Sequence, residues 1–299
     1  MYFNFRKHFS LLFQSKRKYY ACLRPEEYPK ALCQWFQKNT GKPLNLENPQ
    51  TFNEKMQWLK LYDSTQLKTT LSDKLLVKKI VGEKIGMEFI IPSLAEWENE
   101  QDIDFDMLPQ SFALKSSHAS GWNLIVPDKS KINPAHARTR IRKWLKSNYA
   151  FEHGFELHYK NIKPRMILEN YFSNGDNWLY NYKFYCWHGR PVFLRPNMAD
   201  GHGKVVCSYN VLDAQLHPMT GVVGQKPLPS FTFDKKNVTK MLELCRVLSS
   251  GFMFVRVDFY QFAGKIYFGE LTFTPNSGII PWSDEQQDLY YGNMLRLPI

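Results

Sequence analysis

The sequence predicts an α+β fold whose sheets are mostly antiparallel. The strongest signal is a pair of runs rich in aromatic and β-branched residues, 254–260 and 265–272, which the short segment 261–264 joins by a reversal. A second pair, 180–187 and 191–194, has the same character on either side of a His-Gly reversal. Because stretches with helical apolar spacing are interspersed with these hairpins, we expect α+β lobes.

Helices account for much of the remaining chain. A helical lead-in is expected from residue 25 to about residue 62, followed by amphipathic helices at 72–81, 133–149 and 238–250. Ser72 is a good N-cap candidate for the first of these three helices, because its hydroxyl can accept a hydrogen bond from the first helical turn.

Short strands are expected between the helices. Apolar runs bounded by turn residues predict strands at 89–92, 112–115, 124–126 and 165–172. The segment 116–121, which contains three serines and a glycine, is expected to be a small-residue loop between the second and third of these strands.

Length and composition indicate a globular protein. With 299 residues, 43% of them hydrophobic, the chain can bury a substantial core. No run approaches the roughly 20 apolar residues needed to span a bilayer. The cysteines are scattered and form no C-x-x-C pair, which favours reduced thiols; they are Cys22, Cys33, Cys186, Cys207 and Cys245. We therefore expect a cytoplasmic protein.

The net charge of +11 calls for an anionic partner, which could be nucleic acid, a membrane surface, nucleotide phosphates or an acidic glycan. No helix-turn-helix, zinc-finger or RNA-binding signature occurs, so nucleic acid is not expected. Residues 1–20 carry five basic and no acidic side chains interleaved with apolar ones. This pattern suits peripheral contact with the anionic inner face of a membrane, or a first helix that packs on the domain.

Charged residues inside the hairpin at 254–272 are the main functional signal. Side chains alternate between faces along a strand, so Arg256 and Asp258 share one face, and Glu270 and Thr272 share one face of the partner strand. The short reversal brings Asp258 within about one residue of Glu270. Two close carboxylates repel, and Mg²⁺ bound to phosphate oxygens would offset that repulsion. The alternative is an exposed face on which Arg256 and Lys265 pair with both carboxylates.

Seven blocks, in order along the chain, resemble the TupA-like branch of the ATP-grasp proteins, a branch named for teichuronopeptide biosynthesis. The similarity runs from about residue 45 to the C-terminus. The blocks are TFNEKMQWLKL at 51–61, SDK at 72–74, FALK at 112–115, NIKPR at 161–165, YKF at 182–184, VRVD at 255–258 and GELTF at 269–273.

This resemblance implies an ATP-grasp fold, in which two α+β lobes with mostly antiparallel sheets hold ATP between them. It implies a helical N-terminal segment at residues 1–65, with possible membrane-surface contact. An N-terminal lobe with the phosphate loop would follow at 66–165, and a C-terminal lobe with the nucleotide hinge and metal-binding hairpin at 166–299. Proteins of this type use ATP to activate a carboxylate as an acyl phosphate.

The resemblance also assigns the phosphate-binding residues. Lys74 and Lys115 would reach the α- and β-phosphates, where a compact ammonium group suits phosphate oxygen. The loop that folds over the phosphates would contribute small residues whose backbone N–H groups can approach closely. These are Ser116, Ser117, Ser120 and Gly121.

The remaining roles fall on the second half of the chain. Glu169 would contact the nucleotide, and the main chain around Tyr171 would read the adenine edge. Lys183 would lie near the transferred phosphate, and Arg256 would stabilise negative charge as the acyl phosphate forms and collapses. The metal ligands for Mg²⁺ would be Asp258, Glu270 and Thr272.

Each role has a structural alternative. A lysine at the end of a strand, such as Lys74 or Lys183, is by default a surface residue. Glu169 could be a buried carboxylate paired with Arg165. Thr272 stands where many ATP-grasp enzymes have asparagine, so a second metal ion is in question unless Asn276 supplies the missing oxygen.

The expected function is an ATP- and Mg²⁺-dependent carboxylate-amine ligase. It would form an amide on an acidic cell-surface polysaccharide precursor of capsule, O-antigen or teichuronic type. Its partners would be a uronic-acid-containing acceptor and an amino acid or other amino donor. A kinase of the same fold, a glycosyltransferase and a non-catalytic glycan-binding subunit are the alternatives, because a fold alone does not fix a function.

Overall fold

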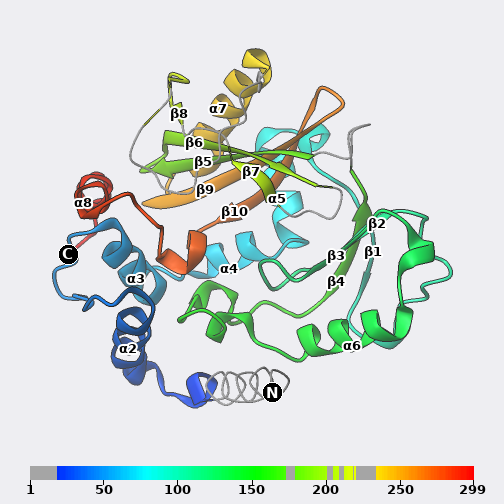
Figure 1. Ribbon diagram of the computed structural model, residues 1–299, viewed down its shortest axis with the longest axis horizontal. Helices are drawn as coiled ribbons and strands as arrows, with labels where there is room; N and C mark the ends of the chain where they lie inside the picture. Colours follow the sequence, from blue (N-terminus) through cyan, green and yellow to red (C-terminus); the bar gives the residue numbers. More distant parts are fainter. Residues whose placement is uncertain (1–18, 173–178, 201–204, 209–211, 218, 220–233) are drawn as a thin grey trace, which may run out of the picture.

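The computed structural model describes residues 19–172, 179–200, 205–208, 212–217, 219 and 234–299 (Figure 1). The segment expected to contact a membrane lies almost entirely in residues 1–18, outside the described residues. None of the described helices is long and apolar enough to cross a bilayer.

The described strands form two sheets, and the smaller one has the order β1-β4-β2-β3 with every neighbouring pair antiparallel. Its strands are β1 (Ser93–Trp97), β2 (Phe112–Ser116), β3 (Asn123–Val126) and β4 (Met166–Asn170). Helix α6 (Pro134–Leu145) packs its buried residues Ala137, Ile141 and Trp144 into the same apolar cluster as this sheet. The expected boundary between the two lobes, at residue 165, falls just before β4, a strand of this sheet. The division into domains stays a prediction.

The larger sheet has the order β10-β9-β5-β6-β7, with β8 also paired to β6. Its described strands are β5 (Leu179–Trp187), β6 (Arg190–Ala199), β7 (Val205–Ser208), β8 (Leu212–Asp213), β9 (Phe254–Phe262) and β10 (Lys265–Thr272). Both predicted hairpins are present, as β5-β6 and β9-β10, and β5 joins them by pairing with β9. Charged side chains on β5 and β9 are therefore brought next to each other.

Helix α7 (Lys235–Ser249) covers one face of the larger sheet (Figure 1). Its sequence sets Val238, Met241, Leu242 and Cys245 at i, i+3, i+4 and i+7, a spacing that gives one apolar stripe. This stripe packs on a core that includes residues of β5, β9 and α5 (Leu76–Ile85). On the opposite face, Tyr185, Trp187 and Phe254 join a second apolar cluster, and charged side chains of β5 and β9 lie on the same face.

The predicted helical lead-in at 25–62 consists of α2 (Tyr28–Thr40) and α3 (Phe52–Tyr62), and α4 (Gln66–Ser72), which was not predicted, follows it. Helix α3 begins with a capping box, in which Thr51 accepts from the Glu54 N–H and the Glu54 carboxylate accepts from the Thr51 N–H. It packs against the C-terminal helix α8 (Glu285–Met294). The described 3-10 helices are η1 (Pro25–Glu27), η2 (Met87–Phe89), η3 (Glu100–Asp102), η4 (Lys129–Lys131), η5 (Tyr149–Phe151), η6 (Leu157–Tyr159) and η7 (Pro275–Gly278).

Two local predictions were wrong. Residues 89–92 are not a strand: Ile90 and Ile91 are buried without ladder partners, and Pro92 has no N–H to donate, so β1 begins only at Ser93. Ser72 does not cap the helix that follows it but ends α4. The Asp73 carboxylate instead accepts from the Leu75 N–H at 2.8 Å, in the turn that precedes α5.

We expect Gly292→Ala to destabilise the protein by about 1–3 kcal/mol, the usual cost of overpacking. A Cβ at this position of α8 would lie 2.3 Å from Gln50 O and 2.7 Å from Phe52 N, which are backbone atoms that cannot rotate away. Urea unfolding measures the change. Asn293→Ala, at the exposed next residue, is the matched control. Equal stability of the two variants would contradict the close packing of α3 on α8.

Candidate active site

The charged residues of the β9-β10 hairpin form one buried cluster. The register places Glu270 opposite Asp258, within the one residue that the spacing predicted, and Thr272 opposite Arg256. Arg256 Nε donates to Asp258 Oδ1 at 2.6 Å, and Arg256 Nη2 donates to Asp258 Oδ2 at 2.7 Å and to Glu270 Oε1 at 2.9 Å. Asp258 is 2% and Arg256 7% exposed, so the face is not a solvated one. Lys265 is exposed near the hairpin turn.

A β-bulge aims Glu270 at this cluster. The register shifts between Phe268 and Glu270, so that Phe268 pairs with Phe259 while Glu270 pairs with Asp258. Phe268 lies in the core of the larger sheet, whereas Glu270 points to the other face. In a regular strand these two residues would share a face. Gly269 allows the bulge, because a Cβ there would lie 3.0 Å from Asp258 O.

The oxygen atoms of this cluster suit magnesium. Thr272 Oγ1 donates to Glu270 Oε1 at 2.8 Å and accepts from Arg256 Nη2 at 2.9 Å. Among the described residues no three His, Cys, Asp or Glu side chains gather as a metal site. A metal here would therefore use Asp258 and Glu270 with oxygens of a bound phosphate, which is the coordination that Mg²⁺ commonly has. Asn276, the candidate additional ligand, is exposed in η7.

Burial and neighbouring charges shift the pKa values of these carboxyl groups. Burial opposes ionisation of Glu270, but the charges of Arg256 and Lys74 outweigh it and lower its pKa to about 2. For Asp258 burial prevails and raises the pKa, against the charges of Arg256 and Lys183. Glu270 is thus ionised at neutral pH and available to a cation.

Lys183 continues this row of charges onto β5. The register pairs it with Asp258 on one side and with Arg195 of β6 on the other, so the three side chains face the same side of the sheet. Burial lowers the pKa of Lys183, and the charge of Arg256 lowers it further. Arg195 was missed by the sequence analysis. Pairing β5 and β6 outward from their turn residues would have placed Leu194 opposite Lys183, because a register shift between Tyr185 and Cys186 brings Arg195 to that place.

A second charged cluster projects from the smaller sheet. Glu169 of β4 accepts from Lys115 of β2 at 2.6 Å and from Lys78 of α5 at 2.7 Å. Burial favours the neutral carboxyl group, but these two lysines hold the pKa of Glu169 below its ordinary value. Glu169 is therefore a buried, paired carboxylate, but its partners are lysines. Arg165 pairs instead with Asp73 at 3.0 Å and with Glu96 at 3.5 Å.

Lys78 was also missed by the sequence analysis. It lies one helical turn after Lys74, at i+4, and this spacing was the available signal. Lys74 donates to Ala119 O in the loop after β2. Burial lowers the pKa of Lys74, while the charge of Glu270 across the space opposes the shift. Lys74 thus lies between the charged clusters of the two sheets.

The loop after β2 presents only part of the predicted phosphate-binding set. Ser116 and Ser117 are fully buried: Ser116 Oγ bonds His118 Nδ1 at 2.8 Å, and Ser117 Oγ donates to Lys163 O at 3.2 Å. Ser120 and Gly121 instead line a cavity. Gly121 has φ of +72° and free space where a Cβ would be. The side chains of Ser116 and Ser117 therefore anchor the loop, and its far end faces the cavity.

Two adjoining cavities, which we call the cleft, lie between the sheets. The first, of about 80 Å³, is lined by Lys74, Lys78, Lys115, Glu169 and Glu270. The second, of about 230 Å³, shares Lys115, Gly121 and Glu270 with the first and also contacts Tyr171, Lys183 and Asp258. All of these residues except Lys78 were predicted as site residues, and the predicted Ser120 lines the cleft as well. Arg256 and Thr272 contribute indirectly, through hydrogen bonds to Asp258 and Glu270.

The outer end of the cleft is aromatic and polar. Phe172 packs on Phe262 and Tyr267 with ring centroids 5.2 Å apart in each case. Within the described part of the chain, Tyr171 Oη and Asn181 Oδ1 are buried without a hydrogen-bond partner. An apolar wall with open polar groups is the usual composition of a small-molecule site.

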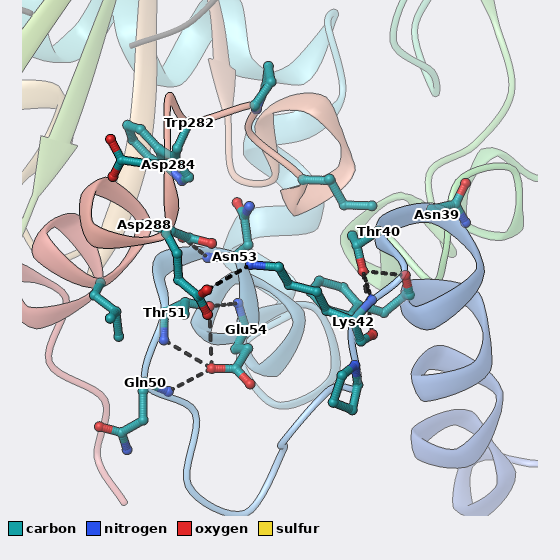
Figure 2. A pocket seen from close by; sticks show the side chains of 16 residues that line it. Asn39, Thr40, Lys42, Gln50, Thr51, Asn53, Glu54, Trp282, Asp284 and Asp288 are labelled. Carbon is teal, nitrogen blue, oxygen red and sulfur yellow. Dashed lines mark hydrogen bonds and ion pairs between the residues drawn. The ribbon is translucent and has the colours of Figure 1, made fainter. Parts of the chain in front are cut away.

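A separate cavity of about 750 Å³ lies among α2, α3 and α8 (Figure 2). It shares no lining residue with the cleft. Figure 2 shows its carboxylates turned to main-chain N–H groups: Glu54 accepts from Gln50 and Thr51 at 3.0 Å, and Asp288 accepts from Asn53 at 2.9 Å. Burial raises the pKa of Asp288 to about 6. These acids stabilise helix ends, and their placement needs no ligand.

Glu270→Gln should lower the free energy of unfolding by about 3 kcal/mol near neutral pH. A carboxyl group with a depressed folded-state pKa stabilises above its unfolded pKa of 4.5, and this contribution is lost as pH falls toward 2. The gap to wild type should therefore shrink by about half at about pH 3. Chemical denaturation at several pH values measures it, with exposed Glu83→Gln as the control. A gap that does not change with pH would contradict the ion pairing.

Comparison with known proteins places this geometry in a family. A family model described as TupA-like ATPgrasp matches residues 54–296. No curated protein matches the chain. Similar solved structures include D-alanine–D-alanine ligase from Bacillus anthracis complexed with ATP, at 14% identity and TM-score 0.40, covering 76% of this chain and 63% of that one.

Two further structures have comparable similarity. D-cycloserine synthetase has 14% identity and TM-score 0.41, with coverage of 76% of this chain and 70% of that one. L-amino acid ligase from Bacillus licheniformis has 12% identity and TM-score 0.38, with coverage of 76% and 48%. The chain thus spans less than two thirds of the length of the D-alanine–D-alanine ligase, 63%. By the family match over residues 54–296, the chain belongs to the TupA-like ATP-grasp family and has the predicted ATP-grasp fold, with α+β content and mostly antiparallel sheets.

Proposed function

We propose that this chain is an ATP-dependent carboxylate-amine ligase that acts through an acyl phosphate. The observation that carries the proposal is the arrangement of charge in the cleft. Lys74 and Lys115 approach from the smaller-sheet side, and Lys183, Asp258 and Glu270 approach from the larger sheet. Cations suited to phosphate oxygens therefore stand opposite carboxylates suited to a divalent metal.

The triphosphate of ATP would lie between these groups. Lys74 and Lys115 would contact its α- and β-phosphates, and Lys183, next to Asp258 in the sheet, would contact the transferred phosphate. Asp258 and Glu270, with Thr272 in their hydrogen-bond network, would hold Mg²⁺. The metal would neutralise charge that develops on the phosphate oxygens.

The reaction would proceed in two displacements. A carboxylate oxygen of the acceptor attacks the γ-phosphorus, the bond to the bridging oxygen breaks, and ADP leaves with an acyl phosphate formed. The nitrogen of an uncharged amine then attacks the acyl carbon, phosphate leaves, and the nitrogen gives up a proton to yield the amide. Arg256, fixed beside both carboxylates, would stabilise negative charge in each step.

The proposed acceptor is an acidic, uronic-acid-containing glycan, a precursor of capsule, O-antigen or teichuronic type. The net charge of +11 supports an acidic partner and makes attraction of an anionic polymer favourable. An amino acid or another amine would be the donor. The basic and apolar residues 1–20 support a cytoplasmic protein in peripheral contact with the inner membrane face.

The proposal is tested by following ADP release with uronic-acid oligosaccharides and a panel of amino acids. We expect release to require both the carboxylate and the amine, with one water lost per coupling in the product mass. Phosphorylated sugar as the product would indicate a kinase. Release that does not require the amine would contradict the ligase assignment.

Asp258→Asn should lower ATP turnover by about 100-fold or more, because it removes a charge from the proposed metal site with little change in shape. Lys265→Ala, at the exposed turn of the same hairpin, is the matched control and should keep wild-type turnover. Turnover and Mg²⁺-dependent nucleotide binding are both measured. Full turnover in Asp258→Asn would overturn the site assignment.

A further inference from the structure

We propose that Lys78 is a positioning residue: it keeps Glu169 neutralised when Lys115 leaves that carboxylate for a nucleotide phosphate. The inference rests on the proposed function, since it concerns how the cleft receives its nucleotide. It assigns a role to a side chain that the sequence analysis did not select and that lies on α5, outside both sheets.

The starting point is that both oxygens of Glu169 are occupied. Lys78 Nζ donates to Oε1 at 2.7 Å, and Lys115 Nζ donates to Oε2 at 2.6 Å. The Glu169 side chain is only 6% exposed, so water cannot replace a lost lysine at little cost. The three groups form one buried ionic unit with a net charge of +1.

The two lysines of this unit differ in their surroundings. Lys115 lines both cavities of the cleft and lies 5.9 Å from the ring centroid of Tyr260, on the opposite sheet. Lys78 is held from a second side, because its Nζ also donates to Ser93 Oγ of β1 at 2.7 Å. It lines the small cavity only. Lys115 is therefore the lysine placed to turn toward a ligand, and Lys78 is the one placed to stay.

When Lys115 moves from Glu169 to a phosphate oxygen, Lys78 keeps the carboxylate from losing its last charged partner. An ammonium group that binds a phosphate oxygen gives up all or part of its bond to Glu169. If Glu169 had no other partner, it would become a buried, unpaired carboxylate, which is strongly unfavourable. With Lys78 in place, the carboxylate keeps one charged hydrogen bond, and the nucleotide gains the contact with Lys115 without leaving a charge unpaired.

The role predicts coupling between Lys78 and Glu169. If Lys78 acts only by neutralising Glu169, it becomes dispensable once Glu169 carries no charge. If Lys78 binds phosphate directly, its loss weakens binding equally in both backgrounds. A double-mutant cycle separates these cases.

The experiment measures binding of a non-hydrolysable ATP analogue with Mg²⁺, and of adenosine, by calorimetry. Lys78→Met should weaken binding of the analogue by about tenfold or more. Adenosine should bind with unchanged affinity, since it has no phosphate for Lys115. In the Glu169→Gln background the same Lys78→Met change should cost less than about threefold. Lys78→Arg, which keeps the charge, should retain wild-type affinity.

The controls separate this role from folding and from the proposed function. Lys79→Met changes the exposed neighbouring lysine of α5 and should leave binding unchanged. If Lys78→Met does not fold, the double variant, which leaves no unpaired charge, is compared with Glu169→Gln alone, and a loss of about tenfold there would still overturn the role. Equal loss in both backgrounds, or no loss in either, overturns the role of Lys78 alone. Failure of the wild type to bind the analogue overturns the proposed function as well.

Discussion

The buried ion pair between Arg256 and Asp258 is the interaction on which the site depends. Its two parallel hydrogen bonds fix the carboxylate in one orientation, and the same guanidinium group reaches Glu270. Without it, two carboxylates placed opposite each other by the hairpin register would repel in a buried setting. The strands place the two carboxylates opposite each other, and the positive charge of Arg256 offsets their repulsion.

At the smaller sheet, too, one charged group pairs with two groups of opposite charge, but the signs are reversed. There one carboxylate, Glu169, holds two lysines, whereas on the larger sheet one guanidinium group holds two carboxylates. The Glu169 group carries one surplus positive charge, whereas Lys183, which the register places beside Asp258, balances the second carboxylate of the larger sheet. A ligand that enters the cleft replaces bonds that already exist, so its binding energy is a difference between two sets of ion pairs.

Local sequence patterns were sufficient for the hairpins and for placing Asp258 within about one residue of Glu270, but they did not predict the β-bulge that sets the two opposite each other. They were not sufficient for Lys78, which contacts Glu169 across 91 residues of sequence, or for Arg195, which a register shift within the β5-β6 hairpin places opposite Lys183. The serines of the loop after β2 show the opposite case, in which predicted site residues do not line the cleft. Ser116 and Ser117 are as small as Ser120, but hydrogen bonds to His118 and to Lys163 O turn them inward, and no local pattern encodes these bonds.

The bulge at Gly269 has a consequence for how this site can change. The extra residue shifts the pleat of β10 by one position, so residues 265–268 alternate out of phase with residues 270–272. If Gly269 were drawn into a regular ladder, Glu270 would turn toward the apolar core while every charged residue remained in the sequence. The functional alignment of the hairpin therefore depends on one local backbone geometry as well as on the chemistry of its side chains.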